Sequence, residues 1–205
     1  MNEEAKTSPT KALFDSLRQL YRQSSQLLLD CDRLMGERSW ESASNTTNMT
    51  TDISGLSTLT NKWFPRYAFR YYIPSEQEGE SEDLINSLKF VSTHFTSGGH
   101  IQINEPLLVA GNIKYCTPFK RKQVLANTNT NYKIYAYWFC RSWFWGKSGK
   151  SYEVWYTHKP EKHYVNTVEI SASFALPLYE ITSSQILEQS VIKRLFEDIP
   201  VDFQQ

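Results

Sequence analysis

Aromatic rings and positive charges alternate along Tyr132–Trp145, the stretch of this chain whose residue types are best suited to chemistry. It reads YKIYAYWFCRSWFW and is followed by a GKSGK loop at 146–150 and by SYEVWYTH at 151–158. Rings of this kind can stack on unpaired bases, and nearby cations can neutralise phosphates. Tyr, Trp and Phe favour strands, and a Gly/Ser/Lys loop is typical of a turn, so the sequence predicts a β-hairpin here.

Strand alternation divides this predicted hairpin into two faces. One face is uncharged and is expected to lie against the core; it carries Ile134, Ala136, Trp138, Cys140, Ser142 and Phe144. The other face mixes rings with cations. Together with cations in the loops, it supplies a candidate nucleic-acid-binding set: Lys120, Arg121, Lys122, Tyr135, Tyr137, Phe139, Arg141, Trp143, Trp145, Lys147 and Lys150. The alternative is that these rings are covered core residues and that the lysines are ordinary surface residues of loops.

The charge is unevenly distributed, although 22 Lys/Arg balance 22 Asp/Glu overall. Residues 1–113 hold 10 basic and 14 acidic side chains, a net of −4, and residues 164–205 hold 2 and 6, again −4. Residues 114–163 hold 10 basic and 2 acidic side chains, a net of +8. The basic segment 114–163 therefore contains the aromatic hairpin, and this coincidence favours a polyanionic ligand.

The patterns that would indicate an enzyme are incomplete. Gly149-Lys150-Ser151 ends like a phosphate-binding loop, but the required first glycine falls at Phe144 and the stretch lies between two predicted strands. We therefore exclude a nucleotide triphosphatase. The remaining acid or base candidates are expected to scatter over separate surfaces; they are His94, His100, His158, His163, Glu105, Glu153 and Glu169.

No metal or cofactor is predicted. Cys31, Cys116 and Cys140 are far apart and lack the spacing of a zinc site, so we expect them to be buried free thiols. No apolar run is long enough to cross a bilayer, and the first residues lack the apolar region of a signal peptide. These observations predict a cytoplasmic protein without a membrane partner.

Two helices are expected to frame the predicted sheet. The first spans residues 8–36, with Ser8 as N-cap, Pro9 at the first position and Gly36 as the stop. Its heptad-spaced apolar residues form three rows, one of which is Leu13, Leu20, Leu27 and Leu34. We expect this side to be buried against the sheet, with pairing to another chain as the alternative. The second helix spans 182–198, with Thr182 and Gln185 as a capping box.

Between the helices lie a polar tract and a series of strands. Thirteen of the 20 residues at 42–61 are Ser, Thr or Asn, which indicates a loop or linker. Within 63–177, strands are predicted at 66–73, 87–96, 107–116 (with a bulge at Gly111) and 165–176, in addition to the hairpin. The sequence thus predicts one α+β domain over residues 1–205, with a mainly antiparallel sheet of five to seven strands.

These patterns lead to two functional hypotheses. The first is a non-catalytic nucleic-acid-binding or accessory module that uses the basic aromatic hairpin, with single-stranded nucleic acid as partner. The second is a protein-interaction or assembly subunit, because aromatic residues and Arg also dominate protein interfaces. In that case the N-terminal helix is a candidate oligomer contact. An enzyme without a recognisable motif ranks third.

Overall fold

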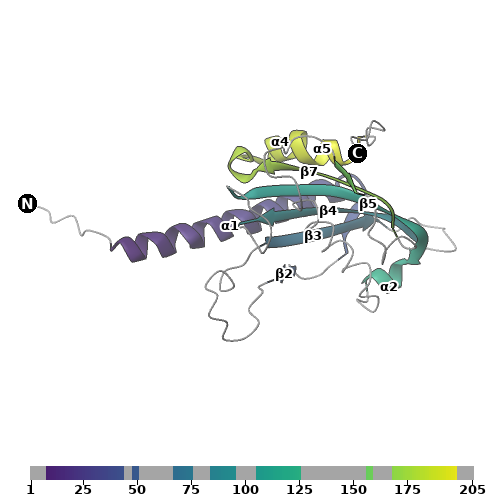
Figure 1. Ribbon diagram of the computed structural model, residues 1–205, viewed down its shortest axis with the longest axis horizontal. Helices are drawn as coiled ribbons and strands as arrows, with labels where there is room; N and C mark the ends of the chain where they lie inside the picture. Colours follow the sequence, from purple (N-terminus) through teal and green to yellow (C-terminus); the bar gives the residue numbers. More distant parts are fainter. Residues whose placement is uncertain are drawn as a thin grey trace, which may run out of the picture.

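The computed structural model describes residues 8–43, 48–50, 67–75, 84–95, 105–125, 156–158 and 168–197 of the chain. Within these residues, one long N-terminal helix and one C-terminal helical segment pack on an antiparallel sheet (Figure 1). The predicted α+β class is therefore confirmed. The predicted single domain from 1 to 205 remains a prediction, because the gaps between the described ranges include most of the hairpin.

Seven strands of the described residues form the sheet in the order β1-β3-β4-β5-β7-β6, with β2 also paired to β3. Every pair is antiparallel, as predicted. Their bounds are β1 (Trp40–Ser42), β2 (Asn48–Thr50), β3 (Tyr67–Pro74), β4 (Leu84–His94), β5 (Leu107–Lys120), β6 (Tyr156–His158) and β7 (Val168–Pro177). The short β2 lies inside the predicted polar loop, where its backbone pairs with β3. Pairing with β3 satisfies the backbone hydrogen bonds of β2 whatever its side chains are. Composition alone therefore did not predict this strand.

Gly111 does not form the bulge predicted for it. The pairing of β5 with both β4 and β7 is continuous through Gly111. The register shifts lie elsewhere, between Ile85 and Ser87 in the pairing with β4 and between Lys114 and Tyr115 in the pairing with β7. A Cβ atom at Gly111 would lie 2.4 Å from the carbonyl oxygen of Ala172 and 2.7 Å from the ring of Phe90. The glycine is needed for this close approach of a ring to the strand rather than for an irregular backbone.

The N-terminal helix α1 (Pro9–Gly36) has the predicted bounds, with Ser8 at the N-cap position and Pro9 in the first turn. The C-terminal helix consists of α4 (Ser184–Leu187), the π-helical turn η3 (Glu188–Ile192) and α5 (Lys193–Leu195), preceded by the 3₁₀ turn η2 (Leu178–Glu180). Its N-cap is Ser183, not the predicted Thr182. The hydroxyl of Ser183 accepts a hydrogen bond from the backbone N–H of Ile186 at 3.2 Å, which is the contact that defines a cap.

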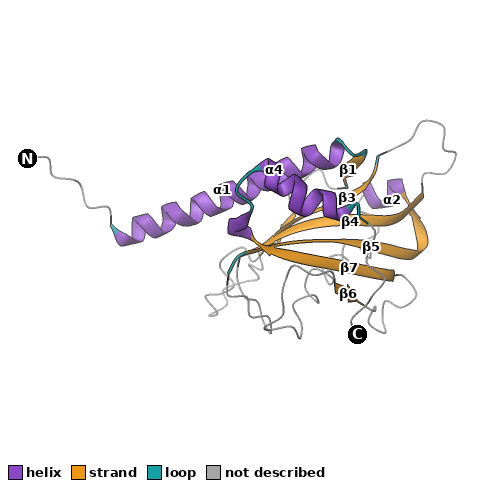
Figure 2. Cartoon of the chain, turned by 90° about the horizontal axis from the view of Figure 1, so that it is seen from above, coloured by secondary structure: helices purple, strands orange, loops and turns teal. Residues whose placement is uncertain are grey.

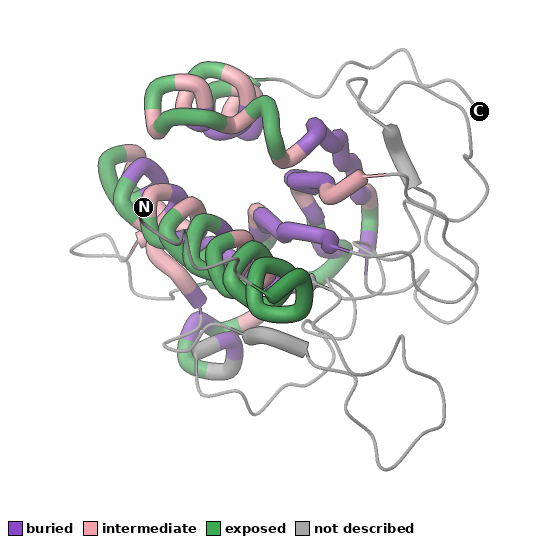
Figure 3. The backbone as a smooth tube through the Cα atoms, turned by 90° about the vertical axis from the view of Figure 1, so that its left-hand side faces the viewer, coloured by how far each residue is buried: buried purple, intermediate pink, exposed green. Residues whose placement is uncertain are grey.

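Both helices cover the same face of the sheet, side by side (Figures 2 and 3). The side chains of α1 and of the C-terminal helix share one buried apolar cluster with strand residues of that face. The cluster comprises Leu28, Cys31, Leu34, Met35, Ala68, Tyr72, Val91, Leu108, Ala110, Phe174, Leu176, Leu187, Val191, Ile192 and Leu195. This layer is the core that positions the two helices relative to each other.

The opposite face of the sheet is also buried. Its apolar cluster includes Phe69, Tyr71 and Ile73, which alternate along β3 as predicted, and Val124 from the short helix α2 (Arg121–Leu125). Strand β7 is therefore buried on both faces, and not only on the face of Phe174 and Leu176. Central strands of a sheet covered on both sides lose the alternation that marks a half-exposed strand.

Buried polar contacts fix the helices on their shared face. Asp32 of α1 accepts a hydrogen bond from the hydroxyl of Tyr72 at 2.9 Å and forms an ion pair with the buried Arg70 at 3.3 Å. At the other helix, Lys89 and Asn112 both donate to the carbonyl oxygen of Leu195, at 2.6 and 3.2 Å. Burial lowers the pKa of Lys89 to about 8, and its amine lies at the negative end of the C-terminal helix, where a cation is favoured.

The predicted burial of the Leu13, Leu20, Leu27 and Leu34 row holds only at its C-terminal end. Leu34 is buried, Leu20 and Leu27 are half-buried, and Leu13 is 61% exposed. The reason is geometric: α1 is longer than the sheet beneath it, and its first turns extend past the strands (Figures 1 and 2). The heptad pattern correctly identifies the apolar side of the helix, but it does not show where the supporting sheet ends.

Candidate functional site

The predicted nucleic-acid-binding set is described in the structure at three positions. Lys120 and Lys122 are exposed where β5 passes into α2. The other members lie outside the described residues, and their role stays a prediction; they are Tyr135, Tyr137, Phe139, Arg141, Trp143, Trp145, Lys147 and Lys150. Of the predicted hairpin, only the backbone of β6 is described, and it pairs with β7.

Arg121, the third described member of the set, is engaged inside the protein. Its guanidinium is buried, forms an ion pair with Glu41 of β1 and donates a hydrogen bond to the carbonyl oxygen of Pro74 at the end of β3. Breaking a buried ion pair typically costs about 3–5 kcal/mol. Contact between Arg121 and a phosphate would require these bonds to be given up, so its observed role is to join α2 to the edge of the sheet.

The three described acid or base candidates do not meet. His94 is buried in β4, with its Nε2 atom 3.0 Å from the hydroxyl oxygen of Ser92, and burial lowers its pKa to about 3. Glu169 pairs with Lys114 at 2.8 Å on an exposed surface, and Lys114 lies opposite Ser87, seven residues from His94 along β4. Glu105 instead lies near Tyr179, and its negative charge raises the pKa of that phenol. His100, His158, His163 and Glu153 have no described side chains.

The cysteines differ from one another. Cys31 is buried in the helix-covered core as predicted, and burial together with Asp32 and Asp30 raises the pKa of its thiol. Cys116 is exposed near the end of β5, so the prediction of burial is wrong there. Cys140 lies outside the described residues. Within the described part of the chain, no three His, Cys, Asp or Glu side chains are grouped so that they could hold a metal ion.

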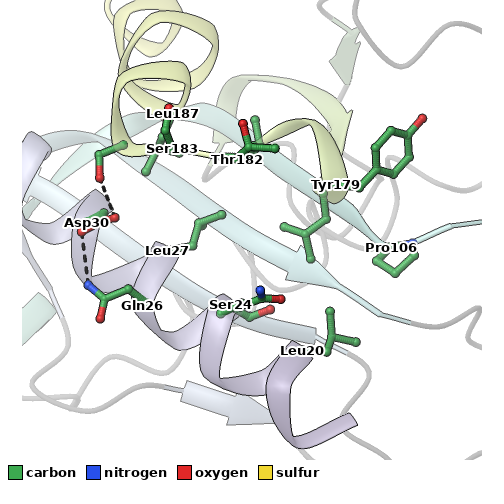
Figure 4. A pocket seen from close by; sticks show the side chains of 14 residues that line it. Leu20, Ser24, Gln26, Leu27, Asp30, Pro106, Tyr179, Thr182, Ser183 and Leu187 are labelled. Atoms are coloured by element: carbon green, nitrogen blue, oxygen red, sulfur yellow. Dashed lines mark hydrogen bonds between the residues drawn. The ribbon is translucent and has the colours of Figure 1, made fainter. Parts of the chain in front are cut away.

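A groove of about 630 Å³ runs between α1 and the start of the C-terminal helix (Figure 4). One wall is the side of α1 that carries Leu20 and Leu27, and the other is the segment from η2 to α4. Its apolar lining consists of Leu20, Leu27, Pro106, Leu178, Ile181 and Leu187. The volume falls within the ~300–1,000 Å³ typical of ligand sites in proteins.

The polar lining of the groove has a single carboxylate. Asp30 of α1 accepts hydrogen bonds from Ser184 of α4 at 2.8 Å and from Gln26 at 3.3 Å (Figure 4). The hydrogen bond from Ser184 joins the two walls, whereas the one from Gln26 lies within α1. Ser24, only 3% exposed, also lines the groove, and its hydroxyl has no hydrogen-bond partner. A buried hydroxyl in that state typically costs about 1–3 kcal/mol.

The projecting half of α1, residues 9–19, extends one wall of the groove beyond the sheet. Every residue in it is exposed except the half-buried Leu17, and Leu13 and Phe14 are 61% and 57% exposed. Contact with the sheet begins at Tyr21, whose ring packs edge-on against Phe95 with centroids 5.3 Å apart. The apolar side of α1 therefore continues past the sheet with exposed side chains.

Comparison of the chain with family models, curated proteins and solved structures gave no match. None of the helices in the described ranges combines the length and apolarity needed to cross a bilayer. The groove and the projecting half of α1 are therefore the candidate sites within the described residues. Sequence reasoning identified the leucines of α1, but not the wall from Leu178 to Leu187, because periodicity does not reveal which distant segment faces a helix.

Proposed function

We propose that this protein is a non-catalytic interaction subunit that binds a protein partner through the projecting half of α1. The observation that carries the proposal is the exposure of Leu13 and Phe14 on a helix that extends past its own sheet (Figure 1). Amphipathic helices are recognised through apolar anchors spaced by three, four and seven residues. Leu13, Phe14 and Leu17 have that spacing, and the rigid C-terminal half of α1 holds them in place.

The charges beside these anchors favour a partner with an acidic edge. Between residues 9 and 22, α1 carries three cations, Lys11, Arg18 and Arg22, and one acid, Asp15. Asp15 pairs only loosely with Arg18, at 3.8 Å on an exposed surface. An acidic rim on the partner would complement this excess of positive charge and accelerate association.

A second copy of the chain fits less well. Lys11 and Arg18 are seven residues apart and therefore lie on the same edge of the helix. In an antiparallel pair of α1 helices that edge would face its own counterpart, which brings like charges together. The expected partner is thus a different protein with an apolar groove or helix flanked by Asp and Glu.

The test compares the substitutions L13E/F14E with L29E. Leu29 is the matched control because it is 51% exposed on the same helix but lies outside the projecting residues 9–19. A protein captured by the wild type is produced in pure form, and its affinity for the three purified chains is measured by calorimetry at two salt concentrations. We expect L13E/F14E to bind at least tenfold more weakly and L29E to bind within about twofold of wild type.

Three results would count against this proposal. One is equal binding of the partner by wild type and L13E/F14E. The second is a wild-type chain that light scattering shows to be a dimer and that becomes monomeric only in L13E/F14E, which would make a second copy the partner. The third is binding of the wild type to anionic vesicles but to no protein, which would make α1 a membrane-surface helix.

A second candidate function is binding of single-stranded nucleic acid by the basic segment 114–163. The observation that favours it is the exposure of Lys120 and Lys122 within a segment of net charge +8. Reversal of both charges should weaken binding of a single-stranded oligonucleotide and reduce its salt dependence, because fewer counterions are released. K193E, at an exposed position of the C-terminal helix, is the control; no binding at low salt would exclude this function.

A further inference from the structure

We propose that the groove between α1 and α4 is a binding site for a single-chain aliphatic molecule whose head group carries no negative charge, such as a long-chain alcohol or amine. This site is separate from the surface proposed for a protein partner, because none of residues 9–19 lines the groove. Its volume of about 630 Å³ is in the range of small-molecule sites, which are mostly apolar with a few fixed polar groups.

The shape and lining of the groove favour a chain over a compact polar ligand. Leucine and isoleucine side chains come from both walls, from Leu20 and Leu27 on α1 and from Leu178, Ile181 and Leu187 opposite. These side chains contain no hydrogen-bonding atoms, so affinity must come from removing apolar surface of the ligand from water. An extended methylene chain presents such surface along its whole length.

The charge of the lining determines the head group. Among the described residues that line the groove, Asp30 is the only carboxylate and none is Lys or Arg. Ser184 and Gln26 fix Asp30 in place, and a carboxylate has lone pairs for further donors. A fatty acid would bring a second carboxylate near Asp30 without a cation to compensate, whereas a hydroxyl or ammonium group can donate to it.

The hydroxyl of Ser24 is an independent sign of an incomplete site. It belongs to a residue that is 3% exposed, it lines the groove, and it has no hydrogen-bond partner. Buried polar atoms in proteins are nearly always satisfied, so one without a partner in a groove wall points to a missing polar group.

The experiment uses the full chain and four probes, each kept below its solubility limit or micelle concentration: dodecan-1-ol, dodecylamine, sodium dodecanoate and octan-1-ol. Dodecanol and dodecylamine should each bind at least tenfold more tightly than dodecanoate. Octanol has four fewer methylenes than dodecanol and should bind about 200-fold more weakly, from the free energy per buried methylene. Asp30→Asn should remove most of the discrimination against dodecanoate.

Blocking the groove provides the structural control. Leu27→Trp places a larger side chain in the groove and should weaken dodecanol binding at least tenfold, while Leu29→Trp, on the outer side of α1, should leave it unchanged. Thermal melting of both variants verifies that they are folded. Binding of dodecanoate as tight as that of dodecanol, equal binding by the two tryptophan variants, or no saturable binding of any C12 probe would overturn the proposal.

Discussion

Substitution of the leucines of α1 by alanine should give stability losses that follow their burial and not their heptad position. Leu28 is 1% exposed in the core shared by the two helices. Leu28→Ala removes about three methylene equivalents, or about 2.4 kcal/mol at ~0.8 kcal/mol each. The cavity left behind adds to this loss, for a total of about 3–5 kcal/mol.

Leu13→Ala should behave in the opposite way. Leu13 is 61% exposed on the projecting half, so little apolar surface is lost, and alanine is the better helix former. We expect a change within about 0.5 kcal/mol, like that of an ordinary surface site. Leu29→Ala should match it, and the half-buried Leu27 should fall between the two extremes.

Urea denaturation followed by circular dichroism measures these differences, since the slope of the transition should not change among the variants. A loss above about 1.5 kcal/mol for Leu13→Ala would show that the projecting half is packed within the monomer. A loss below about 1 kcal/mol for Leu28→Ala would show that α1 is not held on the sheet as described. Either result would refute the reasoning from burial.

Three further predictions concern the buried polar groups and Gly111, where a side chain has no room. Asp32→Ala should cost about 3–5 kcal/mol because it removes the carboxylate that pairs with the buried Arg70. Asp15→Ala, at an exposed ion pair, should cost under about 0.5 kcal/mol. Urea titration of both variants compares the two losses of stability. Gly111→Ala should lower the melting temperature by several degrees, since a Cβ there meets backbone at 2.4 Å, and an unchanged melting temperature would contradict the close approach. Because the pKa of His94 falls from 6.5 to about 3 on folding, its stabilising effect is complete above pH 6.5 and is lost as the pH falls. Between pH 7 and 5 this amounts to about 2 kcal/mol, and His94→Gln should be less acid-sensitive by that amount.

Much of the fold can be predicted from local patterns. Pro9 marks the start of α1 because a proline suits the first turn of a helix, whereas the Ser8 side chain makes no capping hydrogen bond. The alternation of Phe69, Tyr71 and Ile73 likewise identifies one face of β3. These signals depend only on neighbours in sequence, so they need no knowledge of the tertiary structure.

The rest depends on contacts between distant segments. Arginine commonly binds phosphate, so the sequence suggests that role for Arg121. Its guanidinium instead pairs with Glu41, 80 residues away, and no local pattern reveals this contact. The exposure of Leu13 depends on the length of the sheet, and the groove depends on η2 and α4 lying opposite α1. Such information is set by packing, and therefore only the α1 side of the groove could be predicted from the sequence.

Photo-crosslinking tests the central claim, that the projecting half of α1 binds another protein, most directly. A benzophenone amino acid is placed at Phe14 or at Leu29, residues of similar exposure on the same helix, and the chain is irradiated in the cells that express it. The interaction proposal predicts a discrete adduct with a second, different protein at position 14 that is absent at position 29 and is lost when Leu13 is replaced by Glu. Equal adducts at both positions, none at position 14, or an adduct only with another copy of the chain would contradict it.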